Sequence, residues 1–320
     1  MSQLIRSPFG YRTTAREAAA GHDLSGRRMI VTGAASGIGV ETARALALQG
    51  AEVTIAARDL AKAHKVADAI NAEAGGGRVT VGKLDLADLG SVRGFASSWS
   101  GPLHVLINNA GVMASPLMHT AQNFEMQLGA NHLGHFTLTT GLAGALEAGA
   151  KGGKPARVVS LSSIGHRRSD IRWDDPHFRN GDYEKWTSYG QSKTANALLA
   201  VGVTSNWKDR GILANAVMPG GILTPLQRHL SREEQIGFGW IDENGAANER
   251  MKTPEQGAST SIWAAVGAEL EGVGGKYLEN CAEAAPWNAE EPWSGVLHHA
   301  LNPESAERLW AWSQEEIAGA

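Results

Sequence analysis

Short apolar runs alternate along most of the chain with longer stretches whose apolar positions recur at helical spacing. This alternation predicts repeated strand, helix, strand units that build a parallel sheet. The expected strands are 28–33, 51–58, 78–86, 103–111, 156–163, 212–220 and 275–280. The expected crossover helices lie near 37–50, 60–73, 88–99, 121–148, 189–209 and 254–267. We therefore predict an α/β fold, a doubly wound seven-stranded parallel sheet with helices on both faces.

The two ends of the chain lie outside this alternation. Residues 1–26 contain Thr14 and Glu17, which fit a capping box for a short helix that we expect only to pack. Residues 282–320 end in an amphipathic helix over NPESAERLWAWSQEE. Four tryptophans of this end are expected to be packing anchors: Trp287, Trp293, Trp310 and Trp312. We predict one domain at 27–281 with an extension at each end.

Charge and composition exclude several kinds of partner. The 29 Lys and Arg residues against 33 Asp and Glu give a net charge of −4 without a basic run, so no nucleic-acid partner is expected. Cys281 is the only cysteine, so an intramolecular disulfide cannot form. No signal-peptide core and no apolar span of about 18 residues is seen. We expect a soluble cytoplasmic protein without a membrane span.

The first expected strand ends in TGAASGIG, residues 32–39, and a helix follows at once. Gly33, Gly37 and Gly39 allow a tight turn and close approach of a pyrophosphate, which the free N–H groups of the helix N-terminus can bind. A glycine-rich turn alone can be an ordinary connection. Its place after the first strand of a βαβ unit favours a nucleotide site in a Rossmann fold.

TGAASGIG resembles the cofactor motif of the short-chain dehydrogenase/reductase family, and four further motifs follow in the family's order. They are Asp85 in LDL, NNAG at 108–111, YGQSK at 189–193 and PGGILT at 219–224. The resemblance covers roughly residues 27–280. NHLGHF at 131–136, the long connection before YGQSK and the tail ERLWAWS are similar to the retinol dehydrogenase and WW-domain oxidoreductase-like branch.

The resemblance implies an NAD(P)-dependent oxidoreductase and assigns its site residues. The implied cofactor-binding residues are Gly33, Ser36, Gly37, Ile38, Gly39, Arg58, Asp85, Leu86, Asn109, Ala110, Gly111, Tyr189, Lys193, Pro219, Gly220, Ile222 and Thr224. The implied catalytic residues are Asn131, Ser163, Tyr189 and Lys193. In the family the serine holds the carbonyl oxygen, and the asparagine holds a water that links the lysine to solvent.

The residues at the end of the second strand indicate which nicotinamide cofactor binds. An acid there favours NAD, whereas a base favours NADP. Ala57 stands where NAD-dependent members carry an acid, and the guanidinium of Arg58 can pair with a phosphate. Asp59 would repel that phosphate if it turned inward, but it fits the N-cap of the next helix. We predict NADP(H), with NAD(H) as the alternative.

Tyr189 and Lys193 are four residues apart, so they share one face of a helix. A phenol with its ordinary pKa of about 10 is a poor base at neutral pH unless a cation stabilises its anion. We expect Lys193 to supply that charge and to lower the pKa of Tyr189. Ser163 ends the fifth strand and can hold a carbonyl oxygen while Tyr189 transfers the proton.

The 164–188 connection and the 225–253 segment, a mobile lid or a plain loop, adjoin the expected site. Their aromatic residues are candidates for pocket walls or for local packing: Trp173, Phe178, Trp186, Phe238 and Trp240. Such walls would suit a lipophilic aldehyde, ketone or alcohol. A redox-sensing regulatory protein without turnover and a sugar-nucleotide epimerase or dehydratase remain the alternative functions.

Two histidine pairs suggest a metal only weakly. His132 and His135 share a helix face without an evident third ligand, and we expect both to be buried or interface histidines. His298 and His299 are expected to be a solvated pair. No metal is predicted. The family resemblance also implies a homodimer or homotetramer.

Overall fold

The computed structural model describes residues 3–320 and contains one sheet with the strand order β3-β2-β1-β4-β5-β6-β7-β8. The strands are β1 (Arg28–Thr32), β2 (Glu52–Ala57), β3 (Val79–Lys83), β4 (Val105–Asn108), β5 (Ala156–Leu161), β6 (Ile212–Met218), β7 (Tyr277–Glu279) and β8 (Ala282–Glu283). The seven predicted strands are all present and pair in parallel, but β8 adds an eighth, antiparallel strand that the sequence did not predict. Two residues are too few to show an alternation.

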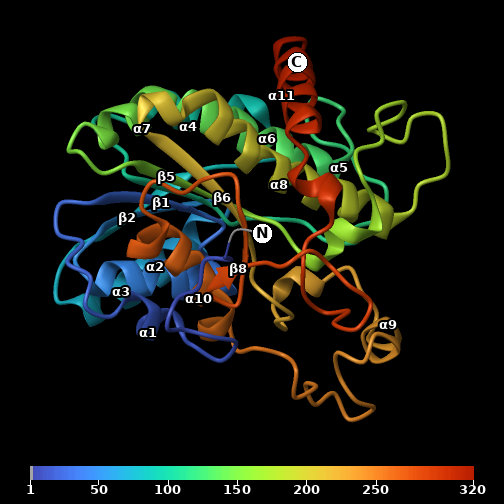
Figure 1. Cartoon of the computed structure of the whole chain (residues 1–320), viewed down its shortest axis with the longest axis horizontal. Coiled ribbons are helices and arrows are strands. Elements are labelled where there is room, and N and C mark those ends of the chain that lie inside the picture. The colour runs from blue at the N-terminus through green and yellow to red at the C-terminus, as the bar shows by residue number, and fades with distance from the viewer. Residues whose placement is uncertain (1–2) are drawn as a thin grey trace.

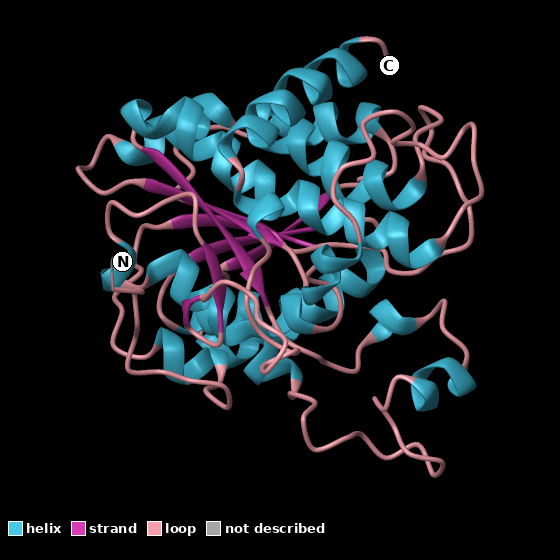
Figure 2. Cartoon of the chain, turned by 45° about the vertical axis from the view of Figure 1, so that its right-hand side comes forward, coloured by secondary structure: helices cyan, strands magenta, loops and turns pink. Residues whose placement is uncertain are grey.

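Helices cover both faces of this sheet, which runs between them in Figure 2. One layer contains α1 (Ala15–Ala19), α2 (Ile38–Leu48), α3 (Leu60–Ala74) and α10 (Pro254–Val266). The other contains α4 (Leu89–Ser98), α6 (Gly134–Gly141), α7 (Ala143–Ala150), α8 (Lys185–Trp207) and α11 (Pro303–Ala318) (Figure 1). Each layer buries its own apolar core against one face of the sheet. The doubly wound α/β prediction is confirmed.

The helix predicted over 121–148 is broken into pieces. It begins as α5 (Met126–Leu128), passes through a π-helical turn at Gly129–Leu133, and continues as α6 and α7. A π-helical turn holds one extra residue per turn, and such turns occur often at functional sites. Asn131 lies inside it, so the irregular backbone coincides with a predicted site residue.

Strand order reverses between β1 and β4, because β2 and β3 extend to one side and β5 onward to the other. In open parallel sheets, ligands bind at such a switch point, beyond the carboxyl ends of the strands. Thr32, Asn108 and Leu161 end three neighbouring strands there. The topology therefore brings the predicted motifs to one edge of the sheet.

The chain ends pack closely on the sheet and its helices. Thr14 and Glu17 form the predicted capping box at the start of α1, and α11 covers part of α8. The 225–253 segment, with the short helix α9 (Arg232–Gly237), extends away from the helical layers (Figure 1). Within residues 3–320, no helix combines the length and apolar character needed to cross a membrane.

Candidate active site

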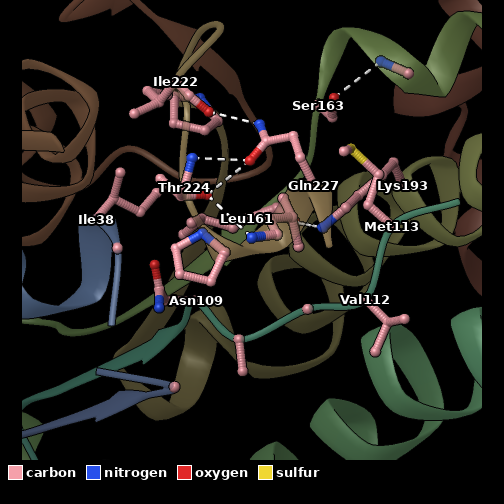
Figure 3. A pocket seen from close by; sticks show the side chains of 18 of the residues that line it. Ile38, Asn109, Val112, Met113, Leu161, Ser163, Lys193, Ile222, Thr224 and Gln227 are labelled. Carbon is pink, nitrogen blue, oxygen red and sulfur yellow. Dashed lines mark hydrogen bonds between the residues drawn. The ribbon is translucent and has the colours of Figure 1, made fainter. Parts of the chain in front are cut away.

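A cavity of about 1300 Å³ opens along the carboxyl ends of the strands, at the switch point. Every predicted cofactor-binding residue except Gly39 lines it, and so does Ser163. Figure 3 shows Asn109, Ser163, Lys193 and Thr224 arranged around this space, on different elements of the chain. Asn131 and Gly39 do not line the cavity, so they can act on it only through neighbours.

The glycine-rich turn packs tightly against the NNAG segment. Gly33 has φ +68°, and a Cβ there would lie 2.7 Å from the Cβ of Ala110. A Cβ on Gly39 would lie 2.6 Å from the Nδ2 of Asn109. Both positions therefore require glycine, and Gly39 is needed for packing behind the turn. The Oδ1 of Asn109 is buried without a hydrogen-bond partner in the described chain.

Thr32 joins these two segments and was not singled out by the sequence. Its hydroxyl accepts hydrogen bonds from the backbone N–H groups of Asn109 (2.9 Å) and Ala110 (3.0 Å). The Nε2 of His135 lies 2.9 Å from the same oxygen. The position before a motif glycine was the only sequence signal for Thr32. His135 was expected to be a buried or interface histidine, but its contact with Thr32 was not predicted.

The end of β2 carries the predicted phosphate-binding base. Arg58 is exposed and lines the cavity together with Lys62 of α3 and Arg228 of the 225–253 segment. The carboxylate of Asp59 accepts a hydrogen bond from the backbone N–H of Lys62 at 3.0 Å, which confirms it as the N-cap of α3. The carboxylate of Asp85 accepts the N–H of Ala87 at 3.1 Å and also lines the cavity.

Tyr189 and Lys193 lie on the buried face of α8 and are 5% and 4% exposed. The Nζ of Lys193 donates to the carbonyl of Leu161 at 3.0 Å and lies 5.6 Å from the centre of the Tyr189 ring. Burial lowers the pKa of Lys193 to about 8. Burial raises the pKa of Tyr189 to about 12, with the Ser163 side chain acting in the opposite direction.

The expectation that Lys193 lowers the pKa of Tyr189 is therefore not met by these protein groups alone. Burial destabilises the phenolate by more than the hydrogen bond from Ser163 stabilises it, so the phenol keeps its proton at neutral pH. A protonated phenol at this position can donate a proton.

Ser163 follows β5 and precedes a short 3₁₀ helix, Ile164–Arg168, whose first turn it caps through the N–H of Gly165 at 3.0 Å. A Cβ on Gly165 would lie 2.7 Å from the Tyr189 ring, so the turn after Ser163 rests directly on the phenol. Ser162 is buried, and its hydroxyl donates to the carbonyl of Lys193 at 2.7 Å. Ser162 thus has a structural role, since it ties the end of β5 to α8.

Asn131 uses its side-chain amide within the protein. Its Oδ1 accepts the N–H of Val112 at 2.7 Å, and its Nδ2 donates to the carbonyl of Val112 and to the hydroxyl of Ser192, both at 2.9 Å. The amide therefore fixes the segment that follows NNAG and ties it to α8. The family's water-binding role for Asn131 stays a prediction.

His166 is a second residue that sequence reasoning missed. Its Nδ1 lies 2.7 Å from the carbonyl of Ser163 and 3.1 Å from the hydroxyl of Tyr277. Its Nε2 accepts the N–H of Leu297 at 3.1 Å. Burial lowers the pKa of His166 to about 4, so the ring is neutral and can accept that bond. Its partners are remote in sequence, which is why no motif revealed it.

Three of the five candidate wall aromatics line the cavity: Trp186, Phe238 and Trp240. The Trp186 ring centre lies 5.1 Å from that of Phe238 and 6.2 Å from that of Tyr189. Trp173 packs under the guanidinium of Arg308, and Phe178 is buried against Tyr183, so neither is a wall. The half of the 164–188 connection that holds them folds away from the site.

Both ends of the chain contribute aromatic rings to the cavity. Tyr11 and Trp293 line it and are 40% and 60% exposed. The expectation that all four tail tryptophans are packing anchors is therefore wrong for Trp293. Trp310 meets that expectation, because it packs edge-on against Phe136 and Trp207.

The histidine pairs form no metal site. His132 and His135 are buried as expected, and burial lowers their pKa values to about 3 and about 4. No group of three or more metal-ligating side chains occurs within residues 3–320. His298 is exposed, but the Nε2 of His299 lies 3.1 Å from the carbonyl of His166, so the two are not a solvated pair.

Known proteins resemble this chain in sequence and in fold. Residues 27–174 match the family described as short chain dehydrogenase. A "Probable oxidoreductase" of Streptomyces antibioticus is 46% identical, covering 93% of this chain and 100% of the relative. Retinol dehydrogenase 12 of Bos taurus is 40% identical over 91% of this chain and 86% of the relative. A crystal structure of a putative uncharacterized protein from Mycobacterium paratuberculosis superposes with a TM-score of 0.70 at 31% identity, covering 96% of this chain and 98% of the other.

The fold and the family match define an oxidoreductase of the Rossmann type that takes a nicotinamide cofactor. The chain belongs to the short-chain dehydrogenase/reductase family, in the retinol dehydrogenase-like branch.

Proposed function

We propose that the chain is an NADP(H)-dependent oxidoreductase that interconverts a lipophilic aldehyde or ketone and the corresponding alcohol. The observation that carries this proposal is the buried phenol of Tyr189, which stands between Ser163 and Lys193 at the aromatic end of the cavity. The name of the relative retinol dehydrogenase 12 is that of an enzyme for an apolar alcohol, which supports the substrate class.

The site residues fit a nicotinamide dinucleotide. Gly33 and Gly37 carry no side chain where a pyrophosphate would approach the turn, and Asn109, whose Oδ1 has no partner within the described chain, lines the same cavity. Arg58, Lys62 and Arg228 put three cations at the end of β2, while Asp59 is engaged as a cap. This charge supports NADP(H) over NAD(H), because only the former carries a 2′-phosphate there.

The protein's own groups perform the proton chemistry in this proposal. Ser163 holds the carbonyl oxygen with a neutral hydroxyl, and Tyr189 donates its proton to that oxygen as negative charge develops. Lys193, anchored to the carbonyl of Leu161, directs its positive charge toward the phenol and toward the cofactor's ribose. When bound, the reduced nicotinamide supplies the hydride that the carbonyl carbon accepts.

The raised pKa of Tyr189 favours its role as a proton donor at neutral pH. In the oxidation direction the phenol must act as a base, which needs the additional positive charge of the oxidised cofactor. We therefore expect carbonyl reduction to be the faster direction near pH 7. The cytoplasmic location and the homodimeric or homotetrameric state remain predictions from the sequence.

The test is the variant Tyr189→Phe, which removes one oxygen from a buried ring. We expect a fall in kcat for carbonyl reduction of at least about 100-fold, because general acid catalysis of this kind contributes 10² or more. Cofactor affinity, measured by NADPH fluorescence, should change little. Ser188→Ala, a buried hydroxyl outside the cavity on the same helix, is the matched control.

The alternatives predict different results. A redox-sensing protein would bind NADPH tightly and reduce none of a broad panel of aldehydes and ketones, with Tyr189→Phe making no difference. A sugar-nucleotide epimerase or dehydratase would act on nucleotide sugars and leave no net change in NADPH. Either outcome would overturn the proposed reaction.

A further inference from the structure

Positively charged side chains line the aromatic end of the cavity, and no acidic side chain of the described residues lines that end. Arg167 and Arg168, which end the 3₁₀ helix after Ser163, both line it. The acidic side chains that line the cavity are Asp59 and Asp85, and both belong to the cofactor end, where they cap backbone N–H groups. The sequence alone could not place a charged residue beside the substrate.

Arg168 is held next to the reacting centre. Its guanidinium lies 5.6 Å from the centre of the Trp186 ring, and the Trp186 ring centre lies 6.2 Å from that of Tyr189. A Cβ on Gly190 would lie 2.8 Å from the Cβ of Arg168, so the stem of this arginine packs closely on the catalytic helix. Stacking on an aromatic face orients a guanidinium and leaves its N–H edge free to bind an oxyanion.

Arg167 has a different set of contacts. It donates a hydrogen bond to the carbonyl of Pro292 and stacks over Trp287, at 5.1 Å from the ring centre. These contacts hold the loop that carries Trp293 against the cavity. Arg167 therefore adds positive charge to this end, but its geometry is already committed to the loop.

No carboxylate of the described chain forms an ion pair with Arg168. Across residues 3–320, neither Arg167 nor Arg168 has an ion-pair partner within 4.0 Å. Glu184 is the acid that interacts with Arg168 at longer range. Its carboxylate already accepts the N–H groups of Trp186 and Thr187 at the start of α8.

We propose that the substrate carries an anionic group, a carboxylate, on an apolar body, and that Arg168 binds it. This inference rests on the proposed function and names its substrate class. Trp186, Phe238 and Trp240 would pack on the apolar body while its carbonyl reaches Tyr189 and Ser163. Arg168 is exposed at the mouth of the cavity, and a guanidinium pairs with a carboxylate through two parallel hydrogen bonds.

The experiment compares long-chain ω-oxo fatty acids of several lengths with their methyl esters, with NADPH as the reductant. The expected result is a kcat/KM at least about tenfold higher for the acid at one or more lengths, as one charge-assisted pair provides. In Arg168→Gln the preference should fall toward unity, through a higher KM for the acid and unchanged kinetics for the ester. Arg179→Gln, an exposed arginine of the same connection outside the cavity, should keep the preference.

Equal kcat/KM for acid and ester at every length, or a preference that persists in Arg168→Gln, would overturn the assignment and leave the proposed reaction standing. If neither compound is reduced, the proposed function fails instead. A binding measurement then tests whether Arg168 binds a carboxylate without any need for turnover. Saturated fatty-acid anions should quench tryptophan fluorescence at lower concentration in the unmodified protein than in Arg168→Gln. Equal titrations would refute it.

Discussion

At the scale of single residues, Thr32 connects parts of the site that are distant in the sequence. One hydroxyl receives two backbone N–H groups of the NNAG segment and contacts the ring of His135. The Nδ1 of His135 lies 2.8 Å from the carbonyl of Asn131, so the chain of contacts continues into the π-helical turn. The wall of the cavity between β1 and β4 is thereby fixed by side chains that do not touch a substrate.

Cofactor choice is also a property of single residues. We expect Arg58→Ala to lower kcat/KM for NADPH by about tenfold or more, since it removes a charge-assisted pair with the 2′-phosphate. The value for NADH should change less than twofold. Steady-state kinetics with both cofactors measure the ratio, and Arg78→Ala, a surface arginine outside the cavity, serves as control. An equal loss with both cofactors would contradict the NADP(H) assignment.

The sequence predicted the residues that lie in continuous motifs, because a motif records the local backbone at a strand end. It did not predict the site residues whose contacts are with residues far away along the chain. His166 is such a case, since it links Ser163 to Leu297. The pKa of Tyr189 could not be predicted either, because it depends on how deeply the folded chain buries the phenol.

At the scale of elements, the N-terminal arm, residues 5–12, does more than the packing expected of it. The carbonyl of Ile5 accepts the backbone N–H of Glu283 in β8 at 2.8 Å, and the N–H of Ile5 donates to the Glu283 carboxylate at 3.1 Å. The hydroxyl of Tyr11 donates to the carbonyl of Arg250, and the guanidinium of Arg12 donates to the carbonyl of Met251 at 3.0 Å. The arm therefore fastens the end of the 225–253 segment.

That end continues directly into the cofactor site. Lys252 is 3% exposed, and a Cβ on Gly220 would lie 3.0 Å from its stem. Its backbone N–H donates to the carbonyl of Gly221 at 2.8 Å, and its Nζ donates to the Oδ1 of Asn280 at 2.8 Å. The arm, Lys252 and the turn between β7 and β8 together support the PGGILT segment.

We expect Arg12→Ala to raise KM for NADPH by about three- to tenfold, as the loss of one or two hydrogen bonds to the segment would allow. The kcat value should stay within about twofold, because Tyr189 is untouched. Arg16→Ala, which breaks only a surface pair with Glu73, is the control. A fall in kcat without a change in KM would refute this role of the N-terminal arm in cofactor binding.

The elements themselves were predicted unevenly. Strands and crossover helices carry a clear period, and their positions were found within a few residues. The break in 121–148 was missed, because the π-helical turn has the same composition as a helix and differs only in its hydrogen bonds. In the 164–188 connection, Trp186 lines the cavity, whereas Trp173 packs against Arg308. Tertiary contacts decide this difference, so the sequence alone could not distinguish the two residues.

At the scale of the whole molecule, three buried neutral histidines make stability depend on pH. Burial lowers the pKa of His132 to about 3 and the pKa values of His135 and His166 to about 4. In the unfolded chain each binds a proton below about pH 6.5. The unfolded state is therefore favoured as the pH falls from 6.5 toward 4, by about 2 kcal/mol per histidine at pH 5.

Urea unfolding at pH 7.5 and pH 5 measures this loss. His132 contacts the hydroxyl of Ser313 at 2.8 Å, so the double variant His132→Leu with Ser313→Ala removes a titrating group and its partner together. The loss of unfolding free energy between the two pH values should shrink by about 2 kcal/mol. His64→Gln, at an exposed position of α3, should leave the loss unchanged. An undiminished loss in the double variant would contradict the assignment.

The parallel sheet and its two helical layers followed from the sequence, because buried parallel strands and their crossovers leave little topological choice. How the two ends complete the molecule did not follow. The arm pairs with β8, and α11 packs Ala306 and Leu309 against Ala195 and Leu198 of α8. Such contacts depend on surfaces that exist only once the central sheet has formed.

The packing of α11 on α8 has a consequence for biosynthesis. A ribosome releases the chain from its N-terminus, so α8 emerges well before α11. Until α11 follows, Ala195 and Leu198 lack the apolar cover that Ala306 and Leu309 provide on the helix that carries Tyr189 and Lys193. The helix with the reacting groups is thus among the last parts of the protein to reach its final packing, and nascent chains halted before residue 303 would be targets for chaperones.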